Sequence, residues 1–330
     1  TRRMLASNSE LLPMGMESFG QSEDLTQRIR HITDMYPEGS SMVAEHVQNA
    51  DDAGASVVKI VLDAHTYGTE SLFGDGLAKW QGPALMVYND GVFSESDFAA
   101  ISRVGQAGKM DKLNSTGRFG LGFCGNYAVT DLPCIVSSDS LVMFDPHLQS
   151  VPGADAQQPG MRMRFADSTA ATGAALAAAA VEADVPAPLG KLAEQYSDQL
   201  APYVAMGCSF NGPLQGTIFR FPLRNTETAA SSKIKPHDPI ADDPHRALLG
   251  MCEAYRSVSE YVLLFTKSVR RVECSYVPPG QPGGERPLEQ PVFSVQVGGR
   301  SLVPRHGVEV VPPLDWSVVP WGDSAELREA

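Results

Sequence analysis

Two short segments carry side chains that can act on a bound phosphate group. Residues 117–123 read Gly-Arg-Phe-Gly-Leu-Gly-Phe, and residues 45–53 read Glu-His-Val-Gln-Asn-Ala-Asp-Asp-Ala. Spaced glycines let a backbone pass close to phosphate oxygens, which N–H groups at the start of a helix can bind. The second segment places a carboxylate and an amide, Glu45 and Asn49, on one face of a helix. Taken together, the two segments predict a nucleotide site with its own base and metal ligand.

Each of the two polar side chains on this helix has a distinct role to offer. Mg²⁺ prefers oxygen ligands and keeps several waters, so the amide oxygen of Asn49 plus nucleotide phosphates suffices to hold it. Glu45, one turn earlier, can then activate a water aimed at the terminal phosphate. Considered without the glycine segment, a Glu-x-x-x-Asn pair is more often the solvated face of an ordinary helix.

A third polar segment, Asn89-Asp90-Gly91, directly follows the apolar run 84–88. Loops that follow buried strands commonly meet ligands. An amide or carboxylate here can hydrogen-bond the edge of an adenine, and the glycine lets the backbone come close. The same residue types are strong turn formers, so a plain turn is the alternative interpretation.

The order of the glycines excludes two familiar phosphate sites. Gly117-x-x-Gly120-x-Gly122 is not the Gly-x-Gly-x-x-Gly of dinucleotide-binding folds, and it lacks the Gly-Lys-Ser/Thr ending of a P-loop. The preceding segment, 105–115, has glycines, two lysines and few apolar residues. It can close over a bound nucleotide, or it is a mobile surface loop with solvated lysines.

Composition narrows the class of protein. The formal net charge is −13, from 26 basic and 39 acidic residues, and a surface of that sign repels nucleic acid. Five cysteines without CxxC spacing indicate reduced thiols and a cytoplasmic protein, with neither a disulfide framework nor a zinc site. The longest apolar run, 174–181, is too short to cross a bilayer, so no membrane association is expected. The first residue is Thr1, which suggests a piece of a longer chain.

Periodicity and turn residues predict the elements that must position these side chains. Helices are expected at 22–35, 40–53, 94–104, 123–128 and 247–265, and strands at 57–63, 84–88, 135–137, 141–144, 217–223, 270–277 and 292–297. The pattern favours an α+β fold, a two-layer sandwich in which helices cover one face of a mostly antiparallel sheet.

The chain divides into three parts by composition. Residues 1–18 are expected to be a disordered lead-in, 19–224 the domain that contains the motifs above, and 225–330 a C-terminal extension. Within the domain, 151–215 is rich in alanine and proline and is expected to be an insertion, helical around 189–205 and without a clear strand until its end.

The motifs described above follow one another in the order found in GHKL (Bergerat-fold) ATPases, the superfamily of the ninety-kDa heat-shock chaperone, gyrase, histidine kinases and MutL. Within it, the sequence resembles the sacsin-type domains. The stretches that carry the resemblance are Phe19-Gly-Gln, Tyr36-Pro-Glu-Gly, 48–55, 81–89, 130–137, Phe144-Asp-Pro-His and 216–224. The similarity is dense over 19–147, returns at 216–224 and is weak in the insertion. It implies a GHKL-type ATP-binding domain over 19–224, with 225–330 as an extension of the same sacsin-type module.

The resemblance implies ATP and Mg²⁺ as ligands and a role for each motif. Glu45 would be the base that activates water, Asn49 the magnesium ligand, and Asn89 would stand where most members have an aspartate that reads the adenine amino group. The nucleotide-binding set that it implies is Asn49, Asp52, Ala53, Asn89, Gly91, Val92, Gly117, Arg118, Phe119, Gly120, Gly122, Phe123 and Thr217.

Two residues depart from the superfamily pattern. Asn89 keeps an acceptor oxygen but lacks the charge of aspartate, which predicts weaker or less selective adenine binding. Phe93 stands where a second glycine is usual and is expected to narrow the pocket. In related chaperones a basic residue reaches the terminal phosphate, and the candidates by sequence are Arg118, Arg220 and Arg224.

We therefore expect a Mg²⁺-dependent ATP-binding domain with slow hydrolysis, part of a large sacsin-like chaperone that acts on protein clients or with co-chaperones. The alternative is a non-catalytic interaction module that keeps the fold and has lost productive nucleotide binding. Histidine kinase and topoisomerase functions fit less well, because no phospho-acceptor domain is apparent and the charge is wrong for DNA.

Overall fold

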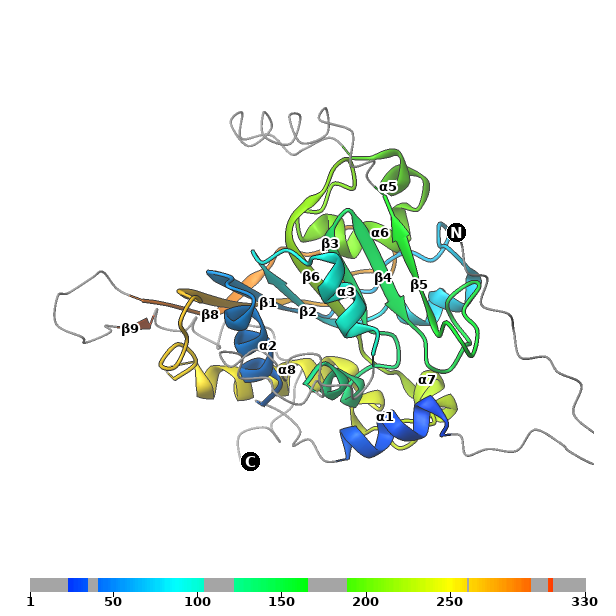
Figure 1. The fold of residues 1–330 in the computed structure, drawn as a ribbon, viewed down its shortest axis with the longest axis horizontal. Helices are drawn as coiled ribbons and strands as arrows, with labels where there is room; N and C mark the ends of the chain where they lie inside the picture. Colours follow the sequence, from blue (N-terminus) through cyan, green and yellow to red (C-terminus); the bar gives the residue numbers. More distant parts are fainter. Residues whose placement is uncertain are drawn as a thin grey trace, which may run out of the picture.

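One continuous sheet organises the chain (Figure 1). The structure is a computed structural model that describes residues 23–34, 41–103, 122–165, 189–259, 261–297 and 308–310. Its nine strands follow the spatial order β5-β4-β3-β6-β2-β1-β7-β8-β9. Only β1 and β7 run parallel, and the other neighbours are antiparallel. The predicted α+β class, with a mostly antiparallel sheet packed against helices, is confirmed.

The elements have the following bounds. The strands are β1 Val57–Asp63, β2 Ala84–Asn89, β3 Cys134–Ser138, β4 Ser140–Phe144, β5 Gly160–Arg164, β6 Leu214–Pro222, β7 Arg271–Val277, β8 Gln290–Val297 and β9 Val308–Val310. The α-helices are α1 Leu25–Thr33, α2 Ser41–Asp52, α3 Glu95–Ile101, α5 Lys191–Gln195, α6 Ser197–Ala205, α7 Thr226–Ser231 and α8 Pro244–Val258. Short 3-10 helices are η1 Asp75–Trp80, η2 Gly122–Ala128 and η3 Pro239–Ala241.

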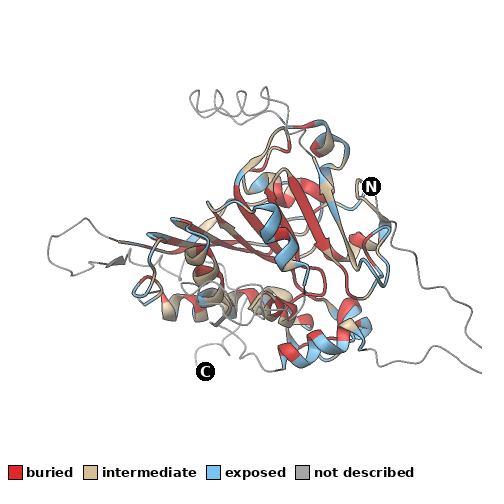
Figure 2. Ribbon diagram, viewed as in Figure 1, coloured by how far each residue is buried: buried red, intermediate tan, exposed pale blue. Residues whose placement is uncertain are grey.

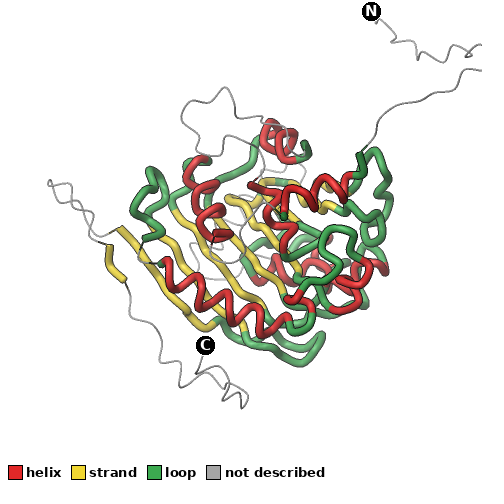
Figure 3. Tube along the Cα trace, turned by 90° about the horizontal axis from the view of Figure 1, so that it is seen from below, coloured by secondary structure: helices red, strands yellow, loops and turns green. Residues whose placement is uncertain are grey.

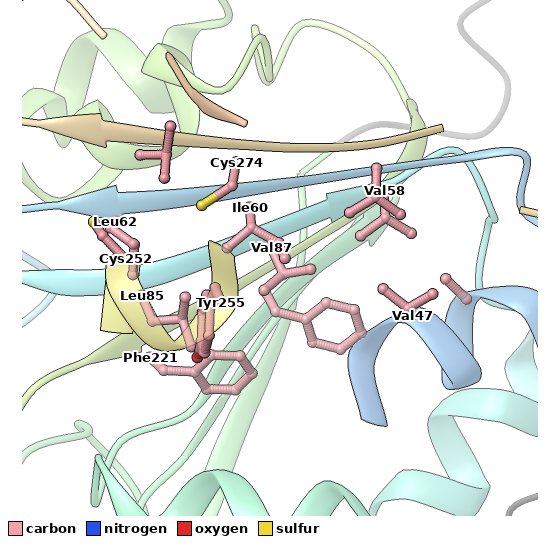
Figure 4. Close-up of a cluster of buried hydrophobic side chains, with 14 of the residues drawn as sticks. Val47, Val58, Ile60, Leu62, Leu85, Val87, Phe221, Cys252, Tyr255 and Cys274 are labelled. Carbon is pink, nitrogen blue, oxygen red and sulfur yellow. The ribbon is translucent and has the colours of Figure 1, made fainter. Parts of the chain in front are cut away.

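The main core lies between one face of the sheet and α2, α3 and α8. Alternate residues of β1 and β2 point into this core: Val58 lies near Val47 of α2, and Leu85 lies near Tyr255 of α8 (Figure 4). Figure 3 shows these helices lying across the strands, and Figure 2 shows that the central strands are buried almost throughout. The helix that carries Glu45 is therefore held on this face by its apolar side.

The insertion forms a second, smaller layer on the opposite face. Met86 and Ile218, which alternate with the residues of the main core, pack there against Trp80 of η1 and against Leu200 and Tyr203 of α6. The expected helices around 189–205 are present as α5 and α6. This part of the insertion packs on the far face of the sheet and buries it.

The prediction that 151–215 has no strand before its end is wrong, because β5 pairs with β4. Its side chains alternate. Met161 and Met163 pack against the buried cluster that contains Leu200 and Tyr203. Arg162 lies 4.0 Å above the ring of Phe98 in α3 and donates to Glu95 at 2.7 and 2.8 Å. Both faces depend on partners distant in sequence, so a local pattern with two arginines did not indicate a strand.

The expected helix 247–265 is shifted toward the N-terminus. It begins at Pro244, after Asp243 accepts the backbone N–H of Arg246 at 3.0 Å, and it ends at Val258. Proline suits the first turn, and an aspartate before it satisfies a free N–H group. The chain then turns, and Asp51 at the end of α2 accepts the N–H groups of residues 267–269 and leads them into β7.

A buried arginine joins the end of η2 to the sheet. Arg224, fully buried just after β6, donates to the carbonyl oxygens of residues 127, 128 and 130 and pairs with the carboxylates of Asp131 and Asp238. These carbonyls lie at the C-terminal end of a helix, where they have no partner within the helix and attract a cation. The position of η2 therefore depends on this side chain.

We expect Arg224→Ala to destabilise the fold by about 3–5 kcal/mol, because it leaves two buried carboxylates without a cation. Arg164→Ala, which removes an exposed partner of Glu95, is the control and is expected to be close to neutral. Urea unfolding followed by circular dichroism measures both. Equal losses for the two variants would contradict this assignment.

Candidate functional site

The polar face of α2 carries the predicted base and the predicted metal ligand side by side. Val47 and Ala50 are buried in the core, whereas Glu45 and Asn49 are partly exposed. The amide nitrogen of Asn49 donates to Oε1 of Glu45 at 3.1 Å. This bond orients the amide, because the nitrogen is held by the carboxylate and the oxygen stays available for a ligand.

Glu45 also lies directly against the last glycine of the 117–123 segment. Gly122 begins η2, and a Cβ built on it would overlap the carboxylate of Glu45. Only glycine leaves room for this contact. The structure thus places Gly122, the last glycine of one motif, next to Glu45 of the other, although the two are far apart in sequence. Gly117, Arg118, Phe119 and Gly120 lie outside the described residues, as does the predicted closing segment 105–115.

The turn after β2 is held by a chain of hydrogen bonds. Thr217 of β6, which faces Asn89 across the sheet, donates to the carbonyl oxygen of Gly91 at 2.7 Å. Its hydroxyl oxygen lies 2.7 Å from that of Ser137, which in turn accepts the N–H of Phe93 at 2.9 Å. The Ser137 hydroxyl also donates to the carbonyl oxygen of Gly216 at 3.0 Å. The predicted residue Thr217 therefore shapes the turn, and its side chain is fully buried.

The same turn contacts the end of α2. A Cβ on Gly91 would stand 3.6 Å from the Cβ atoms of Ala53 and Ala55 and 3.0 Å from Oδ1 of Asn89. The α2 helix, the turn and η2 therefore converge, with Val92 of the turn 48% exposed and Asp52 partly exposed.

Asp90 and Asp51, two acidic residues of these motifs, accept hydrogen bonds from the backbone N–H groups of other segments. Asp90 accepts the N–H groups of Ser56 and Val57 at 2.7 and 3.0 Å and also the hydroxyl of Ser56. Burial alone would raise the pKa of Asp90, but these hydrogen bonds outweigh it and lower the pKa. The same balance lowers the pKa of Asp51, where burial is opposed by the N–H groups of residues 267–269. Sequence reasoning gave neither residue a structural role, since their partners are known only once β1 and β7 are paired.

His46, next to the predicted base, links α2 to η2. Burial lowers the pKa of His46 to about 4, opposed by a hydrogen bond with Asn126. Its ring packs on Phe219 and Phe221 with centroids 5.9 and 5.2 Å apart, and its Nε2 has no partner. Asn126 in turn donates to the carbonyl oxygen of Phe123 at 2.9 Å. No sequence pattern distinguished His46 from an ordinary polar residue.

The aromatic residues at the site lie in one cluster on the sheet. The Phe93 ring lies 5.3 Å from that of Phe98 and 6.1 Å from that of Phe219, and the Phe123 ring lies 5.8 Å from that of Phe144. Phe93 and Phe123 are partly buried and pack against the main core. Phe93, which stands where the superfamily pattern has a glycine, thus packs between Phe98 and Phe219.

Two of the three candidate cations for a terminal phosphate are committed elsewhere. Arg224 is enclosed by its carboxylates, and Arg220 lies on the opposite face of the sheet, where its Nη2 donates to the carbonyl oxygen of Trp80 at 2.8 Å. Arg118 lies outside the described residues. Within the described ranges no group of three or more His, Cys, Asp or Glu side chains is placed to hold a metal ion. The oriented amide oxygen of Asn49 fits a cation that takes its other ligands from phosphate and water.

Comparison with known proteins identifies the family. The family model of the Sacsin domain matches residues 22–286. The chain belongs to the sacsin-domain family. It is 36% identical to human Sacsin over 260 residues, which are 77% of this chain and 5% of Sacsin, so the chain spans a small part of that relative.

Other properties of this sacsin domain concern its thiols and helices. All five cysteines are buried, and none of them forms a disulfide. Burial raises the pKa of Cys134 to about 11 and that of Cys208 and Cys252 to about 12, so these thiols are protonated and poorly reactive at neutral pH. Across the described ranges, no helix has the length and apolarity to cross a membrane.

We expect Gly122→Ala to abolish any nucleotide turnover by this sacsin domain while changing its stability little. The new methyl group displaces the end of a flexible side chain, Glu45, and no backbone. Gly250→Ala, in α8 with open space around the glycine, is the matched control and is expected to keep turnover and to stabilise the helix by up to about 1 kcal/mol. Turnover is measured by phosphate release and stability by thermal unfolding. Unchanged turnover in Gly122→Ala would contradict a shared site.

The buried His46 predicts a loss of stability in acid. Its pKa is about 4 when folded and 6.5 in the reference state, so only the unfolded chain takes up the proton between these values. Its contribution is complete above pH 6.5 and falls by about 1.4 kcal/mol per pH unit below it, until about pH 4. His46→Gln is expected to reduce this slope, and His31→Gln, whose side chain is 73% exposed, to leave it unchanged. Denaturant unfolding from pH 7 to pH 4 tests this; equal slopes in both variants would exclude His46 as the source.

Proposed function

We propose that this sacsin domain binds ATP with Mg²⁺ and hydrolyses it slowly, as a GHKL-type ATPase. The observation that carries the proposal is the contact of the Glu45 carboxylate with Gly122, because it joins a potential base to a glycine-rich phosphate loop. A base is useful only if it stands where the phosphate ends, and a loop of this kind is where phosphates bind. The predicted order of motifs along the chain supports the same site.

Each residue of the site has a part in this function. Mg²⁺, when bound, would neutralise phosphate charge and orient the terminal group. Asn49 would hold it through the oxygen that its bond to Glu45 leaves available. Glu45 would accept a proton from the attacking water, and the N–H groups at the start of η2 would bind phosphate oxygens. The Asn89 turn, fixed by Thr217, would contact the adenine of the nucleotide.

The role of the larger protein is a further part of the proposal. Because the chain corresponds to 5% of human Sacsin, most of such a protein lies outside this domain. We propose that the domain supplies nucleotide-dependent conformational change to a cytoplasmic chaperone that acts on protein clients or with co-chaperones. The net charge of −13 supports protein partners over nucleic acid.

Isothermal titration with ATP and Mg²⁺ tests nucleotide binding. We expect saturable binding below millimolar nucleotide, and a stabilisation of about 2.7 kcal/mol when the ligand is at 100 times its Kd. Absence of heat and of any shift in melting temperature at millimolar nucleotide would overturn the proposal.

The base assignment is tested in the same assay with Glu45→Ala and the isosteric Glu45→Gln. Both are expected to bind ATP and to lose phosphate release by about 100-fold or more, since neither accepts a proton from water. Glu253→Gln, exposed on α8, is the control and keeps turnover. Loss of ATP binding in both Glu45 variants would instead make this residue structural.

A second candidate function is a non-catalytic interaction module with the same fold. It is favoured by the engagement of the two groups expected to meet adenine: Oδ1 of Asn89 accepts a backbone N–H, and the Thr217 hydroxyl is buried in its hydrogen-bond chain. This alternative predicts that no nucleotide changes the melting temperature, the opposite of the titration result expected above.

A further inference from the structure

The Asn89 side chain presents a hydrogen-bond donor to the site. Its Oδ1 accepts the N–H of Gly91 at 3.0 Å, two residues along the turn. Exchanging the amide oxygen and nitrogen would set the NH2 group against that N–H, so the backbone decides the orientation. Gly91 is the only partner that the described residues give this side chain, and Nδ2 is the group left for a ligand.

The turn cannot relax this orientation easily. The Gly91 carbonyl accepts from Thr217 while its N–H donates to Asn89, so both ends of the residue are held. The Phe93 N–H is bound by Ser137, which fixes the far end of the turn. Asn89 is itself 7% exposed and paired with Thr217 across the sheet. The donor therefore has a defined position.

No other side chain on the turn offers a free acceptor in place of the missing carboxylate oxygen. Asp90 is the other polar side chain there, and its carboxylate is engaged by Ser56 and Val57 at the start of β1. Gly91, Val92 and Phe93 have no polar side-chain group. Among the side chains of this turn, Asn89 offers a free polar group, and that group, Nδ2, is a hydrogen-bond donor.

We propose that this site favours purine nucleotides with a carbonyl oxygen at C6, such as those of hypoxanthine and guanine, over adenine nucleotides. This rests on the proposed function, in which Asn89 meets the base. The C6 amino group of adenine is a donor, so against Nδ2 it leaves two donors facing each other without an acceptor. A C6 carbonyl accepts from Nδ2. Asn89 is the specificity-determining residue, and an aspartate in its place would return the preference to adenine.

The test compares ATP, ITP and GTP by titration with Mg²⁺. ITP is the most direct probe, since its base differs from adenine at C6 and in the proton on N1. We expect wild type to bind ITP roughly three- to tenfold more tightly than ATP, the range that one net hydrogen bond supplies. Asn89→Asp keeps the acceptor for the Gly91 N–H and gains a second acceptor, so it is expected to bind ATP more tightly than ITP.

Two further variants complete the design. Asn211→Asp makes the same charge change between α6 and β6, and it is expected to keep the wild-type preference. Asn89→Ala is expected to bind ATP and ITP equally, and it provides the comparison if Asn89→Asp fails to fold by circular dichroism.

The outcomes separate this inference from the function on which it rests. If no triphosphate binds to the wild type, the proposed function itself is wrong. If the wild type binds nucleotide but prefers ATP, or if Asn89→Ala keeps the wild-type ratio of ITP to ATP affinity, the specificity assignment alone is overturned. A preference for ITP that Asn89→Asp reverses supports both.

Discussion

The arrangement of the site depends on one buried cation. Arg224 binds the carbonyl oxygens that end η2 and is neutralised by Asp131 and Asp238, so the C-terminal end of this short helix is fixed to the edge of β6. A short 3-10 helix has little stability of its own and takes its position from such tertiary contacts. With that end fixed, Gly122 at the other end of η2 lies against Glu45. One buried interaction thus helps to fix where Gly122 meets Glu45, the proposed base.

The site combines glycines, which allow neighbouring groups to approach closely, with aspartates, which bind backbone N–H groups. Glycine at 91 and 122 allows close approach, whereas Asp51 and Asp90 gather backbone N–H groups from neighbouring strands. Asp51 and Asp90 are satisfied by backbone N–H groups. Among the polar groups that the described part of the site leaves for the proposed nucleotide are the Glu45 carboxylate, the Asn49 amide oxygen and the Asn89 amide nitrogen. Such preorganisation is typical of binding sites built on rigid elements.

Elements that depend on local sequence were predicted well, whereas elements that depend on contacts distant in sequence were not. The helices α1 and α2 and the strands β1, β2 and β7 have strong local periodicity, and the predicted bounds agree within a few residues. The start of α3 was predicted closely, because its capping box of Ser94 and Asp97 is local in sequence. β5 was missed, because its exposed arginines are held by groups far away in sequence: Arg162 stacks on Phe98 of α3, and both arginines pair with Glu95. The end of α8 was placed too late, because the turn that leads into β7 is set by Asp51.

Sequence alone determined the fold class, the family resemblance and the pairing of a Glu-x-x-x-Asn helix with a glycine segment, because residue spacing and turn chemistry are local properties. Tertiary structure decided what these residues touch. It showed that Glu45 contacts Gly122 and that His46, next to Glu45, is buried. It also showed that Arg220 and Arg224 make structural contacts within the domain. It also decided which end of the Asn89 amide faces the site, because that depends on a backbone N–H held in place by Thr217 from another strand.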